Sequence, residues 1–122
     1  MNSRAKGARG EREWAEYLRD QLHCPQARRG CQYAGRAVSG DETPDVVGGI
    51  DGTHPEVKRT ERLQLYQALD QAVNDCGDSI PYVVHRRNRE DWVIALRAVD
   101  LVEFCEAVVT HMGEQDGTSG NQ

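Results

Sequence analysis

The clearest hydrophobic pattern lies near the start of the chain, between residues 8 and 22. Apolar side chains recur there at helical spacing, which predicts an amphipathic helix. They are Trp14, Ala15, Leu18 and Leu22. Glu11 precedes them by three, four, seven and eleven positions, so its carboxylate lies on the same stripe as the apolar residues. Such a carboxylate either has a partner near the core or complements the positive N-terminus of the helix.

Two short strand-like segments flank the dipeptide Asp51-Gly52, which is the strongest short-range signal for a β-hairpin. Pairing outward from this turn places Asp45, Glu56 and Lys58 on one face of the sheet and the neighbouring valines on the other. The two carboxylates then become diagonal neighbours, with backbones about 7–8 Å apart, so they can converge on one ion.

Pro55 conflicts with this pairing, because it falls at a ladder position that requires an N–H group. A four-residue loop from Ile50 to Thr53 would relieve the conflict and keep the same side chains on each face.

The rest of the chain alternates between helical and strand patterns. The predicted elements are a helix from Leu63 to Cys76 with Gly77 as its cap, strands at 80–85 and 92–96, a helix from Val99 to His111 and a disordered tail at 113–122. The helical connection from Lys58 to the next strand predicts that the two strands are parallel. Residues 1–112 are therefore predicted to form one α/β sandwich around a small mixed sheet.

Composition indicates a soluble protein. The chain has 122 residues, of which 38% are hydrophobic, enough for one core. No apolar run approaches the roughly 20 residues of a membrane span, and the basic N-terminus lacks the apolar core of a signal peptide. We therefore expect a cytoplasmic protein without a membrane partner. The irregular spacing of the cysteines predicts reduced thiols rather than zinc ligands or disulfides. They are Cys24, Cys31, Cys76 and Cys105.

Charge is divided unequally along the chain. Residues 1–40 hold eight Arg or Lys and four acids (+4), whereas the remaining 82 residues hold seven bases and sixteen acids (−9), for a total of −5. The segment from Gln26 to Asp41 is rich in glycine and arginine, which is typical of a loop that contacts a substrate. The N-terminal third is therefore the candidate phosphate-facing surface, although a solvated basic helix would give the same charge.

The paired carboxylates suggest a metal site. Like charges this close shift each other's pKa unless a cation lies between them. Oxygen ligands suit Mg²⁺, with Mn²⁺ as its substitute, rather than zinc. Such an ion polarises a phosphate and activates water, while Lys58 orients that water. The alternative is an exposed strand whose charges have no catalytic role.

The same residues carry a resemblance to a known family. Pro44-Asp45, followed by Glu56-Val57-Lys58, resembles the signature of the PD-(D/E)XK nuclease superfamily. The opening segment from Lys6 to Glu13 resembles the first helix of the archaeal Holliday junction resolvases (the Hjc group) and of related phage resolvase-like endonucleases. The resemblance covers roughly residues 4–104.

This resemblance implies a restriction-endonuclease-like fold and a Mg²⁺-dependent endonuclease that cuts four-way or branched DNA. It implies metal ligation by Asp45, Glu56, the Val57 carbonyl and Glu11, with Lys58 positioning the attacking water. It also implies a homodimer, located in the host cytoplasm if the chain is phage-encoded. The predicted DNA contacts are Arg4, Lys6, Arg9, Arg28, Arg29, Arg36, Ser39, Arg59, Arg86 and Arg87.

Two alternatives stay open. One keeps the chemistry but changes the substrate, giving a nicking or restriction-like endonuclease on duplex DNA. The other is a catalytically inactive module that only binds DNA. The acidic net charge departs from a strongly DNA-binding surface.

Overall fold

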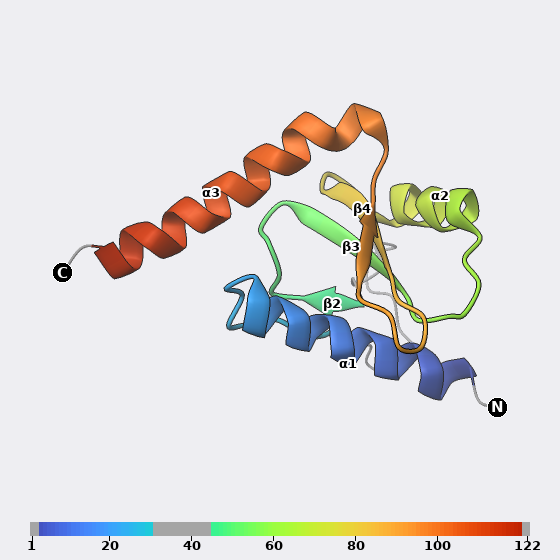
Figure 1. Cartoon of the computed structure of the whole chain (residues 1–122). Helices are drawn as coiled ribbons and strands as arrows, with labels where there is room; N and C mark the ends of the chain where they lie inside the picture. The colour runs from blue at the N-terminus through green and yellow to red at the C-terminus, as the bar shows by residue number, and fades with distance from the viewer. Residues whose placement is uncertain (1–2, 31–44, 121–122) are drawn as a thin grey trace.

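The computed structural model of the chain describes the backbone of residues 3–30 and 45–120, and the side chains of residues 7–30 and 45–115. The elements follow the predicted order of helices and strands (Figure 1). They are α1 (Ser3–Gln21), β1 (Arg28–Arg29), β2 (Val46–Val47), β3 (Thr53–Lys58), α2 (Leu65–Asp75), β4 (Ile80–His85), β5 (Val93–Ala95), the 3₁₀ helix η3 (Ala98–Asp100) and α3 (Leu101–Gly120).

The strands form two sheets. One has three strands in the order β3-β4-β5, and the other consists of the short pair β1-β2. Strand β3 pairs with β4 in parallel, and β4 pairs with β5 antiparallel, so the larger sheet is mixed. The predicted parallel crossover is therefore confirmed, and so is the α/β class with a small mixed sheet.

The predicted hairpin is wrong. Although the turn at Asp51-Gly52 forms, with Gly52 at a φ of 83° and the Thr53 N–H donating to the Ile50 carbonyl at 3.2 Å, β2 does not pair with β3. The reason lies at Gly48, which has a φ of 79° and packs so closely on the Gln26 carbonyl that a Cβ would lie 2.2 Å from its oxygen. The chain bends there, β2 ends and pairs with β1, and β3 is left to pair with β4.

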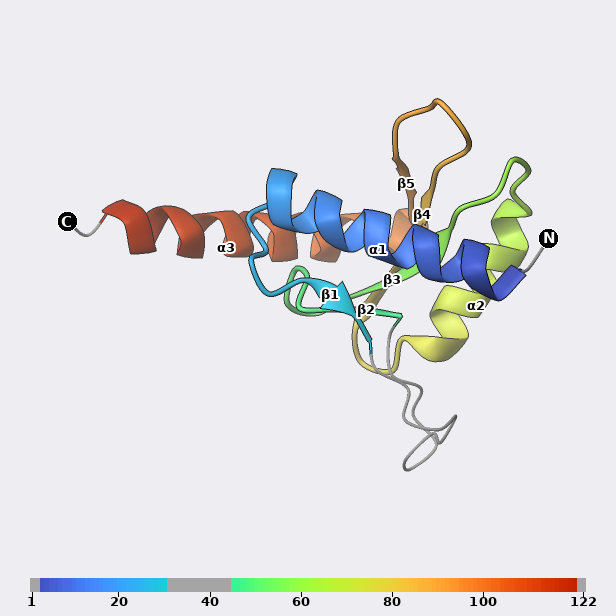
Figure 2. The same cartoon turned by 90° about the horizontal axis from the view of Figure 1, so that it is seen from below.

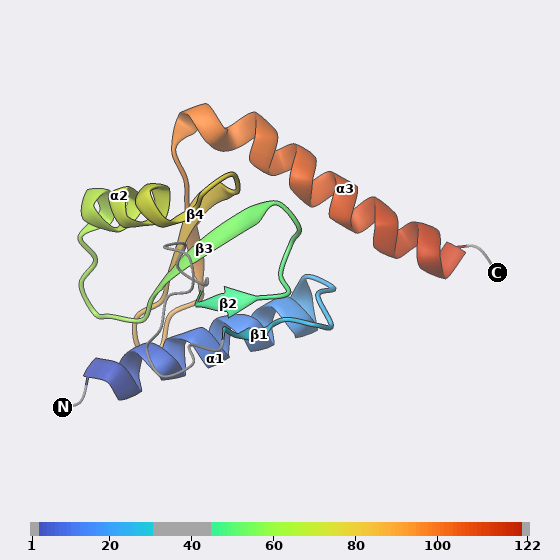
Figure 3. The same cartoon turned by 180° about the vertical axis from the view of Figure 1, so that it is seen from behind.

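Helices α1 and α2 cover opposite faces of the larger sheet (Figures 1 and 3). Side chains alternate along β4, so Val84 packs in the core that contains α1, whereas Val83 packs against α2. The predicted α1 stripe is buried, with Trp14 and Leu18 at 0% exposure. The site described below therefore lies between two helices that are fixed by separate cores.

The last helix is longer than predicted. It begins at Leu101 and continues to Gly120, into the segment predicted as a disordered tail. Because adding residues to an existing helix costs much less than nucleating one, good helix formers such as Glu114 and Gln115 extend it past His111. The buried His111 ring fixes α3 to the end of α1, with Nε2 at 3.0 Å from the carbonyls of both Leu22 and His23.

Two further expectations concern thiols and membranes. Cys24, Cys76 and Cys105 are free, as predicted, and Cys31 lies outside the described residues. Among the described residues, no helix has both the length and the apolar character needed to cross a bilayer. The possible edge strand at Cys31–Tyr33 also lies outside the described residues.

Candidate active site

Strand β3 presents three polar side chains, His54, Glu56 and Lys58, on the face that α2 covers. Glu56 pairs in register with Val83, which packs against α2, and alternation along the strand gives its i±2 neighbours the same facing. The Lys58 ammonium lies 3.4 Å from a Glu56 carboxylate oxygen and donates to the Gln71 side-chain carbonyl at 2.9 Å. Lys58 is thus held between strand and helix.

Glu56 is the most deeply buried carboxylate of this group, with its residue only 4% exposed. Burial raises its pKa to about 7, and the nearby Asp45 charge adds to the rise, while Lys58 opposes it. In the absence of a cation, Glu56 therefore holds its proton to a higher pH than a free carboxylate does. A carboxylate in this state has too little positive charge around it, as expected for a ligand position.

Asp45 reaches the same region from β2. It directly precedes Val46, and its carbonyl accepts a 2.7 Å hydrogen bond from the Gly30 N–H, which holds the chain beside β1. Burial raises the pKa of Asp45, against the favourable charges of His54 and Lys58. The structure therefore brings Asp45 close to Glu56 and Lys58, although it does so through β1-β2 rather than through a hairpin.

Glu11 lies at the inward edge of α1 and accepts a 2.9 Å hydrogen bond from Arg29 Nε on β1. Burial raises its pKa even though Arg29 opposes the rise, and repulsion from Asp45 contributes in the same direction as burial. The helical stripe placed Glu11 on this face, and the structure puts its charge within reach of Asp45.

Two residues of this region were missed by the sequence analysis. His54 is 5% exposed and lies two residues before Glu56, and Asp75, near the end of α2, interacts with it electrostatically. Burial lowers the pKa of His54, and both Asp75 and Asp45 oppose that shift. Alternation along β3 could have identified His54, whereas Asp75 depends on how α2 packs, which no local pattern contains.

The donor set fits Mg²⁺ better than a metal that is fully enclosed by protein. Within the described residues, no three His, Cys, Asp or Glu side chains are grouped closely enough to hold an ion by themselves. Mg²⁺ is commonly bound through one or two carboxylates, with water and substrate phosphate completing its shell. Asp45 and Glu56, both short of positive charge, match that pattern.

A different set of charges lies at the other edge of α1, around Glu13. Its carboxylate accepts hydrogen bonds from Arg9 and Arg59 at 2.9 Å and from Arg86 at 3.3 Å. Although burial raises its pKa, these arginines outweigh burial and lower it. Arg59, predicted as a DNA contact, has a 6% exposed side chain and also donates to Asn88, so its guanidinium is bonded inside the protein.

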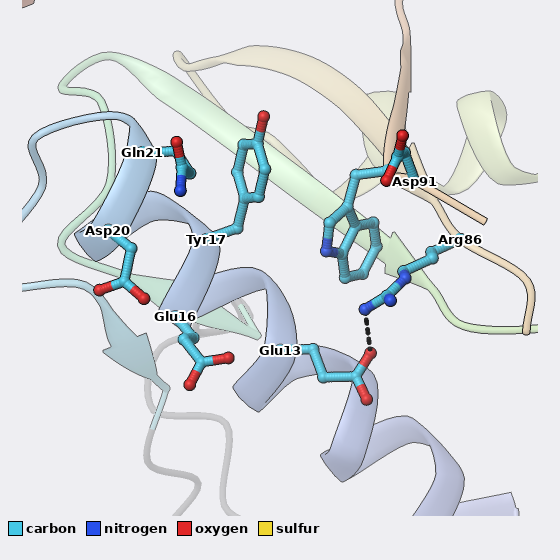
Figure 4. A pocket seen from close by; sticks show the side chains of 8 residues that line it. Glu13, Glu16, Tyr17, Asp20, Gln21, Arg86 and Asp91 are labelled. Atoms are coloured by element: carbon cyan, nitrogen blue, oxygen red, sulfur yellow. Dashed lines mark hydrogen bonds and ion pairs between the residues drawn. The ribbon is translucent and has the colours of Figure 1, made fainter. Parts of the chain in front are cut away.

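Figure 2 shows α1 with β1 on one side and the β4–β5 loop on the other. A groove borders each side of the helix, and Glu13 and Glu16 line both. The groove toward β1 contains the predicted contacts Arg9, Arg28 and Arg29. The pocket toward the β4–β5 loop, seen in Figure 4, holds the Glu13–Arg86 pair and three further carboxylates beside two aromatic rings. Its lining residues are Glu13, Glu16, Tyr17, Asp20, Gln21, Arg86, Asp91 and Trp92.

Of the remaining predicted DNA contacts, the structure describes the side chain of Arg87 only. Arg87 is exposed on the β4–β5 loop and pairs with Glu90 at 3.5 Å. Arg4 and Lys6 belong to α1, but their side chains lie outside the described set, as do the residues Arg36 and Ser39.

Comparisons with known proteins leave the chain without a family assignment. No family model, no curated protein and no solved structure matches it.

Proposed function

We propose that this chain is a Mg²⁺-dependent DNA endonuclease with a restriction-endonuclease-like fold, and that its substrate is a four-way or branched DNA junction. The observation that carries the proposal is the pair of carboxylates with raised pKa values, the half-buried Asp45 and the buried Glu56, beside the positioned ammonium of Lys58. A structural charge cluster would surround its acids with cations, as three arginines surround Glu13, whereas Glu56 has an ion pair with Lys58 alone among the described residues.

Each residue would have a distinct role. Asp45, Glu56 and the Val57 carbonyl would hold the ion, which would supply Lewis-acid polarisation of the scissile phosphate. Lys58, fixed by Gln71 and Glu56, is placed to orient a water and to neutralise charge that develops on the phosphate. Glu11, held by Arg29, would extend the acidic environment from the α1 side.

We further propose that the protein acts as a homodimer, because a two-fold symmetric junction requires two cuts. Support comes from apolar side chains that are well exposed on the last helix and just before it. They are Val99 (77% exposed), Val102 (68%) and Val109 (69%). Light scattering on the purified protein tests this part separately from catalysis.

The deciding experiment compares a labelled immobile four-way junction with a linear duplex of the same arm sequence, in Mg²⁺, Mn²⁺ or EDTA. We expect paired, symmetric, metal-dependent nicks confined to the junction. Asp45→Asn should abolish cleavage and leave junction binding largely intact, because it removes a ligand oxygen charge without changing the shape of the side chain.

The other outcomes are equally informative. Equal cutting of junction and duplex would replace the resolvase with a general endonuclease. Binding without any cutting would indicate an inactive DNA-binding module. Cleavage that survives Asp45→Asn would refute the metal-site assignment.

A further inference from the structure

The groove between α1 and β1 has a volume of about 620 Å³, compared with about 470 Å³ for the pocket at the other edge of α1. Arginine dominates its lining. The lining residues are Arg9, Arg12, Glu13, Ala15, Glu16, Arg19, Arg28 and Arg29. Of these, Arg12 and Arg19 were not among the predicted DNA contacts.

The arginines of this groove differ in how far their charge is neutralised. Arg9 and Arg29 each form an ion pair with a glutamate at 2.9 Å. Arg19 and Arg28 instead donate to backbone carbonyls, at 2.8 and 2.9 Å, and Arg12 has no ion pair within the described part of the chain. A carbonyl cancels no net charge, so three guanidinium groups can still attract an anion.

The groove adjoins the candidate active site at Arg29, which lines the groove and also bonds Glu11. From Glu11 to Arg19 the helix advances eight residues, or about 12 Å. One DNA strand carries a phosphate about every 3.4 Å along the duplex axis, so this distance corresponds to about three nucleotides.

We propose that this groove binds the phosphates of about three nucleotides next to the scissile phosphate, on one side of the cut only. The inference rests on the proposed nuclease function and adds the path of the substrate strand. That path runs from Asp45 and Glu56 along the seam between α1 and β1, toward Arg19 and Arg28.

The opposite edge of α1 explains why binding is one-sided. Its pocket presents Asp20 and Asp91, which do not line the groove, and Glu16, which borders both; no ion pair neutralises these three carboxylates within the described residues (Figure 4). A phosphate backbone would be repelled there, so the DNA must leave the site along the basic edge.

The test measures junction binding by fluorescence anisotropy in EDTA at several salt concentrations. The Arg12→Gln/Arg19→Gln variant is compared with wild type and with Arg97→Gln, whose exposed guanidinium pairs with Asp100 outside the groove. Two lost phosphate contacts should lower the slope of log affinity against log salt by about 2. The Arg97→Gln slope should stay at the wild-type value.

A second measurement locates the bound phosphates. Neutral methylphosphonates are placed one at a time on each side of the branch point. Methylphosphonates on one side of the branch point should weaken binding by wild type. They should have little effect on the double variant, because it already lacks the arginines that would contact those phosphates. Three outcomes would overturn the proposal. They are a salt slope of the double variant equal to that of wild type, methylphosphonates that weaken binding equally in wild type and double variant, and no DNA binding at all. Circular dichroism spectra establish that each variant is folded.

Failure of this proposal can be distinguished from failure of the nuclease. Binding in EDTA does not depend on cleavage, so one-sided binding by a protein that cuts nothing would support the groove and refute the nuclease. Cleavage in Mg²⁺ with unaltered salt slopes would refute the groove and leave the nuclease standing.

Discussion

Glu11 and Glu13 are two residues apart on the same helix, yet their surroundings differ. Glu11 faces inward, has one arginine partner and a repelling neighbour in Asp45, and its pKa is raised chiefly by burial. Glu13 is half-buried as well, but three arginines surround it and its pKa is lowered. A two-residue step along a helix rotates a side chain by more than half a turn, which separates the two environments.

The contrast separates a candidate functional carboxylate from a structural one. Glu13 joins α1 to Arg59 after β3 and to Arg86 after β4, so its cations are already part of the fold. Around Asp45 and Glu56 the cations are too few, which is the condition that a bound ion would correct. Charge balance therefore distinguishes the two sites better than the number of acids does.

The sharpest way to break the contrast is to neutralise each glutamate in turn. Glu11→Gln should lower junction cleavage by about 10³-fold and leave the free energy of unfolding unchanged or higher, because the lost charge was unfavourable. Glu13→Gln should lower the free energy of unfolding by about 2 kcal/mol and change cleavage by less than about tenfold below its melting temperature. Cleavage assays and urea titrations measure both; the reverse assignment of effects would contradict the comparison.

The next largest effect concerns Arg59. Replacing it with alanine removes a guanidinium whose side chain is 6% exposed. Glu13 then loses one of its three arginines, and the Asn88 side-chain oxygen loses its donor. We expect Arg59→Ala to cost about 3 kcal/mol in the free energy of unfolding. The exposed Arg62→Ala should change it by less than about 0.5 kcal/mol. Equal values for the two variants in urea titrations would show that the Glu13 cluster contributes little.

The smallest expected effect is the pH dependence that Glu56 gives to the free energy of unfolding. The pKa of Glu56 is raised from 4.5 to about 7, so the folded state binds this proton more tightly than the unfolded state. The stability that results is present at low pH and is lost as pH rises through about 7. In EDTA the free energy of unfolding should fall by about 2 kcal/mol from Glu56 alone between pH 5 and 8.

Glu56→Gln supplies the control, since a neutral amide cannot lose this proton. Its stability should vary less with pH than that of wild type over the same range. Glu13 contributes with the opposite sign, because its pKa is lowered and its stabilisation is lost as pH falls. If the free energy of unfolding varied with pH in the same way in wild type and Glu56→Gln, the raised pKa of Glu56 would be refuted.

Local pattern was sufficient to predict most of the secondary structure. The α1 stripe, the strand Ile80–His85 and the parallel crossover all follow from periodicity and from the length of a connection. These features depend on neighbours in sequence or on chain geometry, which one sequence contains.

The pairing of β2 and the bonding of Arg59 depend instead on tertiary contact. The positive φ of Gly48 matters because the Gln26 carbonyl, more than twenty residues earlier, occupies the space beside it. Likewise, Gly10 allows α1 to pass so close to Arg59 that a Cβ would lie 2.6 Å from the arginine Cβ. The sequence instead predicted Arg59 as a DNA contact that follows Lys58.

For the candidate site, alternation correctly placed Glu56 and Lys58 on one face of β3, where the structure shows their ion pair. The route by which Asp45 arrives was mispredicted, and His54 and Asp75 were missed, because β1 and α2 had to be packed first. Whether these residues cut DNA stays a prediction.

The parallel pairing of β3 with β4 also bears on how the protein is made. Among the described strands, β3 pairs with β4 alone, and it gains this partner after α2 and Ile80–His85 have been synthesised. Parallel pairing requires closure of that whole connection. We therefore expect the polar face of β3 to become ordered late in folding. A ribosome-bound chain that ends before Ile80 would carry Asp45, Glu56 and Lys58 without the strand that holds two of them in place, so the candidate site would not yet be formed.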